Sequence, residues 1–313
     1  MLIRKMTERD AEPLFRLLSD EETMRYLEPV FDRPKADAFL HAAGLGAEPL
    51  ILAAEENGEF IGYVIFHDYD ERSREIGWVL LPEYRGRGYA STLTEELIER
   101  AFSEGNDAVL ECSSKQAATK HIAERFGFAF DGMRDGCEVY RLMLGDMLLP
   151  RLSERFRVRR LGEGDVEAFY LLSASNPLFY RFHPPFVTRE SILGDMLALP
   201  PGKSMRDKLY IGFFDENGLA AIMDLILGYP EKSMAFIGLF MVDGSLQGTG
   251  VGSAMIRECE SALRGCRFKK IRLAADSGNP QSGAFWRKNG FAPTGEVYPS
   301  GDGLVYAMEK MIT

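Results

Sequence analysis

Two short glycine-rich runs in this chain have the composition of an anion-binding loop. The first, RGRGYA, covers residues 85–90, and the second, QGTGVGS, covers residues 247–253. Glycine lets the backbone approach an anion closely and adopt positive φ, so that successive N–H groups converge on one point. Each run precedes a segment with apolar residues at helical spacing, and a helix adds free N–H groups and the positive end of its dipole. The two runs therefore predict two sites for a phosphate or a pyrophosphate.

Three phosphate-binding patterns differ in the residues that they require. A P-loop needs a Lys after its last glycine, and neither run provides one. A dinucleotide fingerprint needs G-x-G-x-x-G, but Ser91 and Ser253 stand where its third glycine belongs. The pattern R/Q-x-x-G-x-G/A is complete in both runs, at Arg85, Gly88 and Ala90 and again at Gln247, Gly250 and Gly252.

Other landmarks of the chain also occur twice and in the same order. Residues 3–12 (IRKMTERDAE) recur as residues 158–167 (VRRLGEGDVE), and RFGF at 125–128 recurs as KNGF at 288–291. The loop glycine and the later glycine are 39 residues apart in the first copy (88 to 127) and 40 in the second (250 to 290). The repeated unit has the size of a domain, which is too long for a solenoid repeat. We therefore predict two tandem domains, residues 1–146 and 155–313, with a linker within residues 145–155.

The elements that hold these loops are expected in the same order in both copies. Apolar runs bounded by turn residues predict strands, and apolar residues at intervals of three and four predict helices. In the first copy we expect strands at 2–6, 50–54, 60–66, 75–81, 108–112 and 138–144, and helices at 10–18, 90–102 and 117–126. In the second copy we expect strands at 156–161, 209–214, 219–227, 235–242, 271–275 and 304–311, and helices at 165–173, 250–263 and 281–288. Each copy is thus predicted to be a mixed, mostly antiparallel central sheet flanked by helices, an α+β architecture.

The composition of the chain excludes several classes of protein. A net charge of -10 disfavours binding to nucleic acid or to an anionic membrane through bulk charge. No apolar run approaches the ~20 residues of a membrane span, and the charged first residues do not resemble a secretory signal. The four cysteines show no C-x-x-C spacing, and there are only four histidines, so that we expect neither a disulfide framework nor a metal site. These features favour a cytoplasmic location.

The motifs taken together resemble the GCN5-related N-acetyltransferase (GNAT) superfamily, in a tandem two-domain form. The R/Q-x-x-G-x-G/A loop matches in both copies. The helix motif N-x-x-S before a Gly-Phe pair is met at Asn279, Ser282 and Gly290-Phe291, and in weaker form at Gln116, Thr119 and Gly127-Phe128. The first copy, with EIGWVLLPEY at residues 75–84, is similar to the ribosomal-protein-acetylating branch. The resemblance implies an acyltransferase that takes acetyl-CoA as cosubstrate and acetylates an amine by direct transfer in a ternary complex.

The resemblance also implies which residues bind acetyl-CoA. In the family the central strand carries a bulge before the loop, and one freed backbone N–H polarises the thioester carbonyl. The residues implied in the second copy are Met241, Val242, Gln247, Gly248, Thr249, Gly250, Val251, Gly252, Ser253, Asn279, Ser282 and Phe285. In the first copy they are Val79, Leu80, Arg85, Gly86, Arg87, Gly88, Tyr89 and Ala90. For Arg87 a solvated side chain is the alternative to a phosphate contact.

An amine acceptor must lose a proton before it attacks, because an alkylammonium has a pKa of about 10.4. Asp224, which interrupts an apolar strand, and Glu75, on the central strand of the first copy, are the candidate bases. An ion-paired structural carboxylate is the alternative for Asp224. The Tyr that family members often use as an acid is replaced by Trp286 in the second copy and by Ala123 in the first.

Two other functions remain open from the residues alone. One is a non-catalytic CoA sensor or interaction module built from degenerate copies, and the other is a dinucleotide enzyme that uses the loops differently. The fuller motif set of the second copy favours that copy as the active one. The acceptor, a small-molecule or peptide amine, is expected to be selected by the parts that do not repeat, residues 23–47 and 176–208. His183, in the second of these parts, is a candidate for a lid over the cleft or for aromatic packing.

Overall fold

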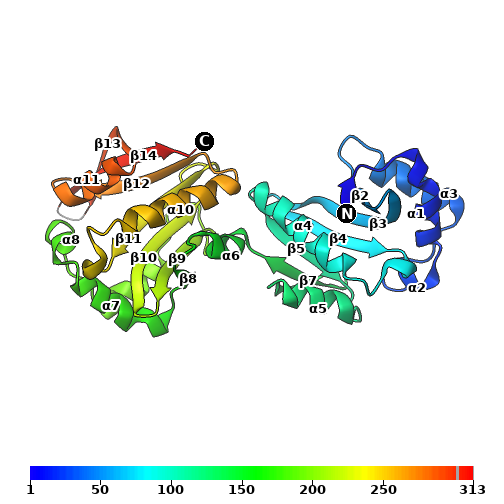
Figure 1. Ribbon diagram of the computed structural model, residues 1–313, viewed down its shortest axis with the longest axis horizontal. Coiled ribbons are helices and arrows are strands. Elements are labelled where there is room, and N and C mark those ends of the chain that lie inside the picture. The colour runs from blue at the N-terminus through cyan, green and yellow to red at the C-terminus, as the bar shows by residue number, and fades with distance from the viewer. Residues whose placement is uncertain (301–302, 313) are drawn as a thin grey trace. The chain divides into compact units, whose positions relative to one another are not determined.

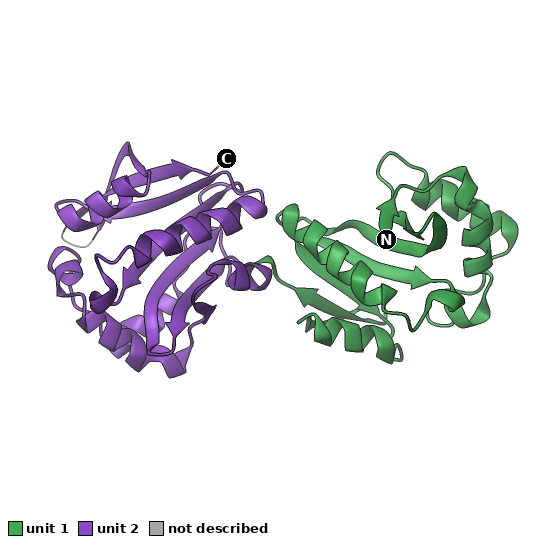
Figure 2. Ribbon diagram, in the orientation of Figure 1, with its two compact units in different colours: residues 1–144 green, residues 145–313 purple. Residues whose placement is uncertain are grey.

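The chain folds into two compact units, Met1–Leu144 and Gly145–Thr313. The structure is a computed structural model that describes residues 1–300 and 303–312. Figures 1 and 2 show that each unit is one sheet with helices packed around it. Residues 145–155, expected from the sequence as a linker, begin the second unit. They include most of α6 (Leu144–Leu148) and a short 3-10 turn (Leu149–Arg151), and Leu148 and Leu152 are fully buried.

In unit 1 the predicted strands and helices occur in the predicted order, together with others that the sequence did not predict. The strands are β1 (Leu2–Arg4), β2 (Ile51–Glu56), β3 (Glu59–Asp70), β4 (Ser73–Leu80), β5 (Asp107–Cys112), β6 (Ala129–Arg134) and β7 (Cys137–Leu142). The helices are α1 (Ala11–Leu18), α2 (Glu21–Met24), α3 (Arg33–Phe39), α4 (Tyr89–Ser103) and α5 (Ala117–Arg125).

Unit 2 repeats this order. Its strands are β8 (Arg157–Arg160), β9 (Lys208–Asp215), β10 (Gly218–Leu227), β11 (Met234–Val242), β12 (Lys270–Asp276), β13 (Ala292–Ser300) and β14 (Gly303–Met311). After α6, its helices are α7 (Val166–Ala174), α8 (Pro177–Phe182), α9 (Arg189–Leu197), α10 (Val251–Gly265) and α11 (Pro280–Lys288).

The two sheets have the same topology. The strand order is β1-β2-β3-β4-β5-β7-β6 in unit 1 and, read from the same edge, β8-β9-β10-β11-β12-β14-β13 in unit 2. Every neighbouring pair is antiparallel except β4 with β5 and β11 with β12. This confirms two tandem α+β domains with mixed, mostly antiparallel sheets.

The two parallel pairs are short, and this opens each sheet in its middle. Strand β4 pairs with β5 only over Ser73–Glu75, and β11 pairs with β12 only over Met234–Ile237. Beyond these residues the carboxyl-terminal halves of β4 and β11 have no ladder on that side. Each glycine-rich loop follows directly, so the loop lies at the end of a strand that has parted from its neighbour.

The central strands of the two units differ in one respect. In β11 the register against β10 shifts between Asp224 and Leu225, so that Gly238 has no partner. Met241 and Val242, the positions to which the resemblance pointed, stay in register with Ile222 and Ala221. The bulge therefore lies at Gly238 rather than at Met241. In β4 the register runs without a shift from Leu80 back to Arg74, so that Val79 and Leu80 lie in a regular ladder.

Helices cover the sheet where the sequence pattern places apolar side chains. In α10, Val251, Met255, Cys259 and Leu263 are all buried, which confirms the predicted apolar stripe at intervals of four. A second core group lies between α7, α9 and the strands β9 to β11, and includes Phe169, Ile192, Tyr210 and Met241. Together these cores fix β9, β10 and β11 relative to the helices that cover them.

Several elements were not predicted. Strands β6 and β13 are largely exposed edge strands, and β13 contains two prolines, so that neither shows an apolar alternation. Helix α3 lies within residues 23–47, and α8 and α9 lie within residues 176–208. These segments do not repeat between the copies, so the comparison of copies gave no information about them.

Candidate active site

The glycine-rich loops have the backbone geometry of an anion cradle in both units. Gly86 and Gly88 have φ of 72° and 88°, and Gly248 and Gly250 have φ of 76° and 91°. Gly88 and Gly250 are the N-cap residues of α4 and α10, where no side chain caps the helix. Apart from neighbouring residues of the loop and helix, no described atom lies within 4 Å of a Cβ built on any of the four glycines. Each loop is therefore open at its glycines, and no N-cap side chain occupies the first-turn N–H groups, which are the groups that bind phosphate at helix N-termini.

The first residue of each loop pattern binds the protein rather than facing that space. Gln247 Nε2 donates to Asn176 Oδ1 at 2.5 Å and to the carbonyl oxygen of Val242 at 3.2 Å. Arg85 Nε donates to the carbonyl oxygen of Leu80 at 3.1 Å, and its other nitrogen donates to Thr23 Oγ1. These bonds tie each loop to the end of the strand before it, so that Gln247 and Arg85 position the loop.

Asn176 is a site residue that the sequence analysis missed. It is buried, and its Nδ2 donates to the carbonyl oxygens of Leu172 and Val242 at 2.9 and 3.1 Å. It therefore joins the end of α7 to the end of β11 and to the loop. A lone Asn in a segment that does not repeat carries no pattern that would have identified it.

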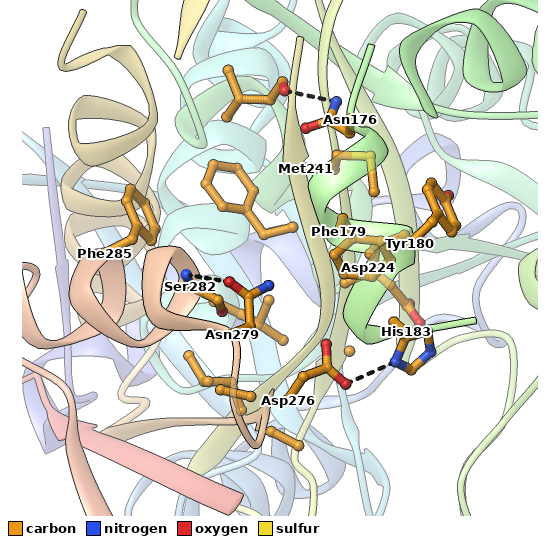
Figure 3. Close-up of a pocket in the computed structure, with 18 of the residues that line it drawn as sticks. Asn176, Phe179, Tyr180, His183, Asp224, Met241, Asp276, Asn279, Ser282 and Phe285 are labelled. Carbon is orange, nitrogen blue, oxygen red and sulfur yellow. Dashed lines mark hydrogen bonds and ion pairs between the residues drawn. The ribbon is translucent and has the colours of Figure 1, made fainter. Parts of the chain in front are cut away.

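Unit 2 contains a cavity of about 1020 Å³ that joins the loop to Asp224. Figure 3 shows Asn279, Ser282 and Phe285 on one side of it, and Phe179, Tyr180 and His183 on the other. Eleven of the thirteen residues expected in the second copy line it: Asp224, Met241, Val242, Gln247, Gly248, Gly250, Gly252, Ser253, Asn279, Ser282 and Phe285.

The two other residues expected in the second copy have different surroundings. Thr249 is exposed, and its hydroxyl donates to the carbonyl oxygen of Leu246 at 2.7 Å. The side chain of Val251 is buried in the core under α10. Only the backbone of these two residues can therefore contribute to the cradle.

Unit 1 has a cavity that lies away from its glycine-rich loop. Its volume is about 690 Å³, and it is lined by residues of the segment 21–30 together with Ser113 and Lys115. It reaches neither the loop at 85–90 nor Glu75. The Arg87 guanidinium lies 5.8 Å from the centroid of the Tyr84 ring, and the Tyr89 ring packs edge-on against the same ring.

Glu75 lies among other charged groups of the unit 1 sheet. Its carboxylate is 3.6 Å from His67 Nε2, and burial raises the pKa of Glu75. It is the last residue of β4 to pair with β5, opposite Val109. Its position is therefore at the point where the strands part, while the described cavity of its unit lies away from it.

The helix motif is intact only in unit 2. Asn279 is the N-cap of α11, and its Oδ1 accepts from the backbone N–H of Ser282 at 3.1 Å. In unit 1 the equivalent Gln116 accepts instead from the backbone N–H of Ser113, so that it does not cap α5. The start of α11 is thereby fixed beside the cavity.

No hydroxyl occupies the position of the family's Tyr. Trp286 is buried and packs edge-on against Phe291 and Phe285, and the ring of Phe285 stacks on Phe240. The hydroxyl of Tyr306 lies against Gly283 on α11 rather than in the cavity lining. Phe240, Phe285 and Trp286 form one wall of the cavity.

Asp224 faces the cavity and is held by an ion pair. Lys208 Nζ donates to Asp224 Oδ2 at 2.8 Å, while Asp224 Oδ1 is buried and has no hydrogen-bond partner among the described residues. Burial raises the pKa of Asp224, and the hydrogen bond and charge of Lys208 act against that rise. Both alternatives for this residue, an ion-paired carboxylate and a carboxylate in the cleft, therefore apply together.

A second pair closes one side of the cavity. His183 Nδ1 and Asp276 Oδ1 are 2.9 Å apart and join the end of α8 to the end of β12 (Figure 3). This hydrogen bond raises the pKa of His183. Asp195, on α9, also lines the cavity, and burial raises the pKa of its carboxyl group.

Within residues 1–300 and 303–312, no group of three or more His, Cys, Asp or Glu side chains is placed to hold a metal ion. None of the helices described is both long enough and apolar enough to cross a bilayer.

Comparison with known protein families finds acetyltransferase (GNAT) models in both halves of the chain. A family model described as "Acetyltransferase (GNAT) domain" matches residues 1–129, and one described as "Acetyltransferase (GNAT) family" matches residues 177–291. The chain is also 29% identical over 142 residues to YnaD of Bacillus subtilis, described as an uncharacterized N-acetyltransferase. That match covers 44% of this chain and 84% of YnaD.

Solved structures similar to parts of the chain carry similar descriptions. A GNAT-family acetyltransferase from Bacillus anthracis has a TM-score of 0.42 and 23% identity, covering 46% of this chain and 94% of that one. A putative acetyltransferase from Salmonella typhimurium, solved with acetyl-CoA, has a TM-score of 0.37 and 22% identity, covering 46% of this chain and 94% of that one.

Proposed function

Both halves of this N-acetyltransferase belong to the acetyltransferase (GNAT) family, and from that membership we propose that unit 2 transfers the acetyl group of acetyl-CoA to an amine. One observation carries the choice of unit 2. Its open strand pair, its bulge at Gly238, its loop and its carboxylate Asp224 all border a single cavity of about 1020 Å³. A cavity of this volume is large enough for a cosubstrate arm and an acceptor together.

In this proposal acetyl-CoA lies along the parted edge of β11. The pyrophosphate would be bound by the backbone N–H groups of residues 248–253 at the start of α10, where the helix dipole favours an anion. The pantetheine arm would pass between β11 and the residues Asn279, Ser282 and Phe285 of α11. The thioester would then reach the bulge at Gly238, where a backbone N–H released from the ladder can polarise its carbonyl.

Asp224 is the proposed general base. The ammonium form of the acceptor gives one proton to Asp224, and the free amine attacks the thioester carbonyl. The new C–N bond forms as the C–S bond breaks, the nitrogen loses a second proton, and the CoA thiolate takes up one. The overall reaction converts the ammonium and acetyl-CoA into the acetylated amine, CoA thiol and one proton released to solvent.

The departing thiolate needs little help from an acid. A cysteine thiol has a pKa of about 8.5, and a thiolate is therefore a much better leaving group than an amine. With Trp286 in the position of the family's Tyr, we propose that water from the open side of the cavity protonates the thiolate.

The acceptor end of the cavity favours a cation. It is lined by the carboxylates Asp195, Asp224 and Asp276, and the cations beside them are Lys208 and His183. Lys208 is paired with Asp224, and His183 with Asp276. The carboxylate of Asp195 therefore remains to attract the ammonium group of a small-molecule or peptide amine.

We test the proposal with acetyl-CoA and four acceptors that represent the open classes: 2-phenylethylamine, putrescine, kanamycin and the dipeptide Ala-Ala. Release of CoA thiol would be followed with a thiol reagent, and CoA binding by calorimetry. Turnover of at least one amine is expected. CoA binding without turnover on any of them would instead favour the sensor, and binding of NADH without binding of acetyl-CoA would favour the dinucleotide enzyme.

The two loops provide a matched pair of variants. Gly250→Phe puts a bulky side chain at a φ of 91° and into the proposed phosphate site, so that turnover should be lost. Gly88→Phe makes the same change at a φ of 88° in unit 1 and should leave turnover intact. Full activity of Gly250→Phe would refute the assignment of unit 2 as the active half.

For unit 1 the same features favour a role without catalysis. Its strand β4 has no bulge beside the loop, Gln116 does not cap α5, and the described cavity does not reach the loop. We propose that unit 1 either binds CoA without transferring its acetyl group or serves as a scaffold. Two CoA sites in wild type and one in Gly88→Phe, counted by calorimetry, would identify the first role.

A further inference from the structure

The cavity of unit 2 contains a buried ammonium group that the reaction above does not consume. Lys208 begins β9 and is only 2% exposed. Its Nζ donates to Asp224 Oδ2 at 2.8 Å and to the carbonyl oxygen of Ala198 at 2.9 Å, and lies 5.0 Å from the centroid of the Tyr210 ring. A buried ammonium is costly unless it is paired and hydrogen-bonded, so that this position is closely specified.

The backbone of Lys208 is also held in place. Its carbonyl oxygen accepts from Arg160 at 2.6 Å, and Arg160 in turn pairs with Asp146 at 3.1 Å. Its side chain joins β9, β10 and the residue directly after α9. The ammonium therefore cannot leave Asp224 without disturbing three elements.

Only one carboxylate oxygen of Asp224 accepts a hydrogen bond from a described residue. Oδ2 accepts from Lys208, whereas Oδ1 is buried and accepts from no described residue. The hydroxyl of Tyr210, which is opposite Asp224 in the register of β9 and β10, is likewise buried without a described partner. Both residues line the cavity. Buried polar atoms in proteins are nearly always paired, so these two atoms mark an unusual polar site directly beside the cavity.

The carboxylate also lies beside the bulge of β11. A Cβ on Gly238 would be 2.9 Å from Asp224 Oδ2, so that any larger residue there would require the carboxylate to move. Strand β11 parts from β12 directly after Ile237. Asp224 is therefore fixed at the point where, in the proposed function, the thioester meets the amine.

We propose that Lys208 is a positioning residue for acetyl transfer, which holds the Asp224 carboxylate beside Gly238 through Oδ2 and keeps the carboxylate ionised. This inference rests on the proposed function of unit 2. Other titratable groups face Asp224: Tyr210 from β9 and Asp195 from α9, with His183 of α8 beside Asp195, while residues 238–240 of β11 contribute none. Burial and Asp195 raise the pKa of Asp224, and Lys208 lowers it.

The kinetic test removes the charge of Lys208. Lys208→Met and Lys208→Gln are compared with wild type in the pH profile of kcat/KM, using acetyl-CoA and whichever of the four amines wild type turns over fastest. The acid limb of this profile gives the pKa of the general base in the free enzyme. It should move to higher pH by roughly one to three units in both variants. Lys208→Arg, which keeps the charge, should bring the limb back toward wild type.

A matched control removes a lysine–carboxylate ion pair that lies outside the cavity. Lys270 on β12 pairs with Glu309 on β14 at 2.9 Å, and neither residue lines the cavity. Lys270→Met should leave the acid limb unmoved. If Lys208→Met does not fold, Lys208→Gln, which retains hydrogen-bond donors, provides the same comparison.

A second measurement needs no acceptor. The carboxyl carbon of Asp224 is followed by ¹³C NMR in protein labelled at aspartate Cγ and is assigned with Asp224→Asn. In Lys208→Gln its titration should move to higher pH; an unchanged titration together with an unchanged acid limb overturns the role of Lys208. If wild type acetylates none of the amines, the proposed function has failed, and the NMR titration alone decides whether Lys208 controls the ionisation of Asp224.

Discussion

At the scale of single residues, the chemistry of unit 2 depends on how carboxylates are paired. Asp224 pairs with a buried Lys on the neighbouring strand, and Asp276 pairs with His183 from the helix across the cavity. The first pair fixes a carboxylate in place. The second joins α8 to β12, and it depends on the protonation of an imidazole that is half exposed. The two pairs therefore respond differently to pH.

We predict that the pKa of His183 lies above its usual 6.5 because its Nδ1 is hydrogen-bonded to Asp276. A raised pKa in the folded state means that the pair stabilises the protein below about pH 6.5 and that this contribution is lost as the pH rises through the raised value. Asp276→Asn should bring the midpoint back toward 6.5, as measured by NMR of the imidazole protons. The three other histidines, which are in unit 1, serve as internal references. An unchanged midpoint in Asp276→Asn would show that the pair does not form in solution.

At the scale of elements, the start of α11 is defined by one side chain. The Oδ1 atom of Asn279 accepts from the backbone N–H of Ser282, and Pro280 follows at the first helical position. Pro at this position lacks only an N–H that would have no partner within the helix. The cap places Ser282 and Phe285 along the cavity. The corresponding helix of unit 1 has no such cap, which is a physical difference between two copies of one motif.

Loss of this cap should be measurable. Asn279→Ala should lower the free energy of unfolding by about 1 kcal/mol, because a Ser, Thr, Asn or Asp cap has roughly that effect. Asn279→Ser keeps a capping oxygen and should restore stability to urea. If the amide of Asn279 also contacts the pantetheine, Asn279→Ser will still bind CoA more weakly in calorimetry than wild type does. Equal stability of wild type and Asn279→Ala would contradict the capping role.

At the scale of the whole molecule, the chain consists of two copies of one fold that have diverged in a specific way. Both units keep the sheet order, the parted parallel strands and the left-handed loop glycines. Unit 2 additionally has the bulge, the helix cap and the cavity that reaches the loop. Each unit has its own sheet and its own buried core, so that each is expected to fold by itself.

This expectation can be tested by division of the chain. A protein of residues 145–313 should fold with the secondary structure of one such sheet, measured by circular dichroism, and should bind CoA as tightly as the full chain does. A protein of residues 155–313, which lacks the segment with the buried residues Leu148 and Leu152, should be less stable to urea. Failure of residues 145–313 to bind CoA, with binding by the full chain, would show that unit 1 is required for the site.

Several features could be predicted from the sequence alone, because they depend on local rules. The loop glycines require positive φ, and the stripe in α10 follows from the helical period. The repetition of these signals in one order determined two tandem α+β domains. The same repetition identified the loop residues that line the cavity of unit 2.

Only the tertiary structure decided which carboxylate faces the cavity and what surrounds it. Lys208 and Asp224 are 16 positions apart in the chain, and they meet because β9 and β10 are paired in one register. His183 and Asp276 are 93 positions apart and come from segments with no common pattern. The bulge at Gly238 likewise depends on the pairing with β10, and no local signal marks it. Spacing along the chain fixes what a loop or a helix can do, whereas a site built across strands depends on register, which forms only when the sheet does.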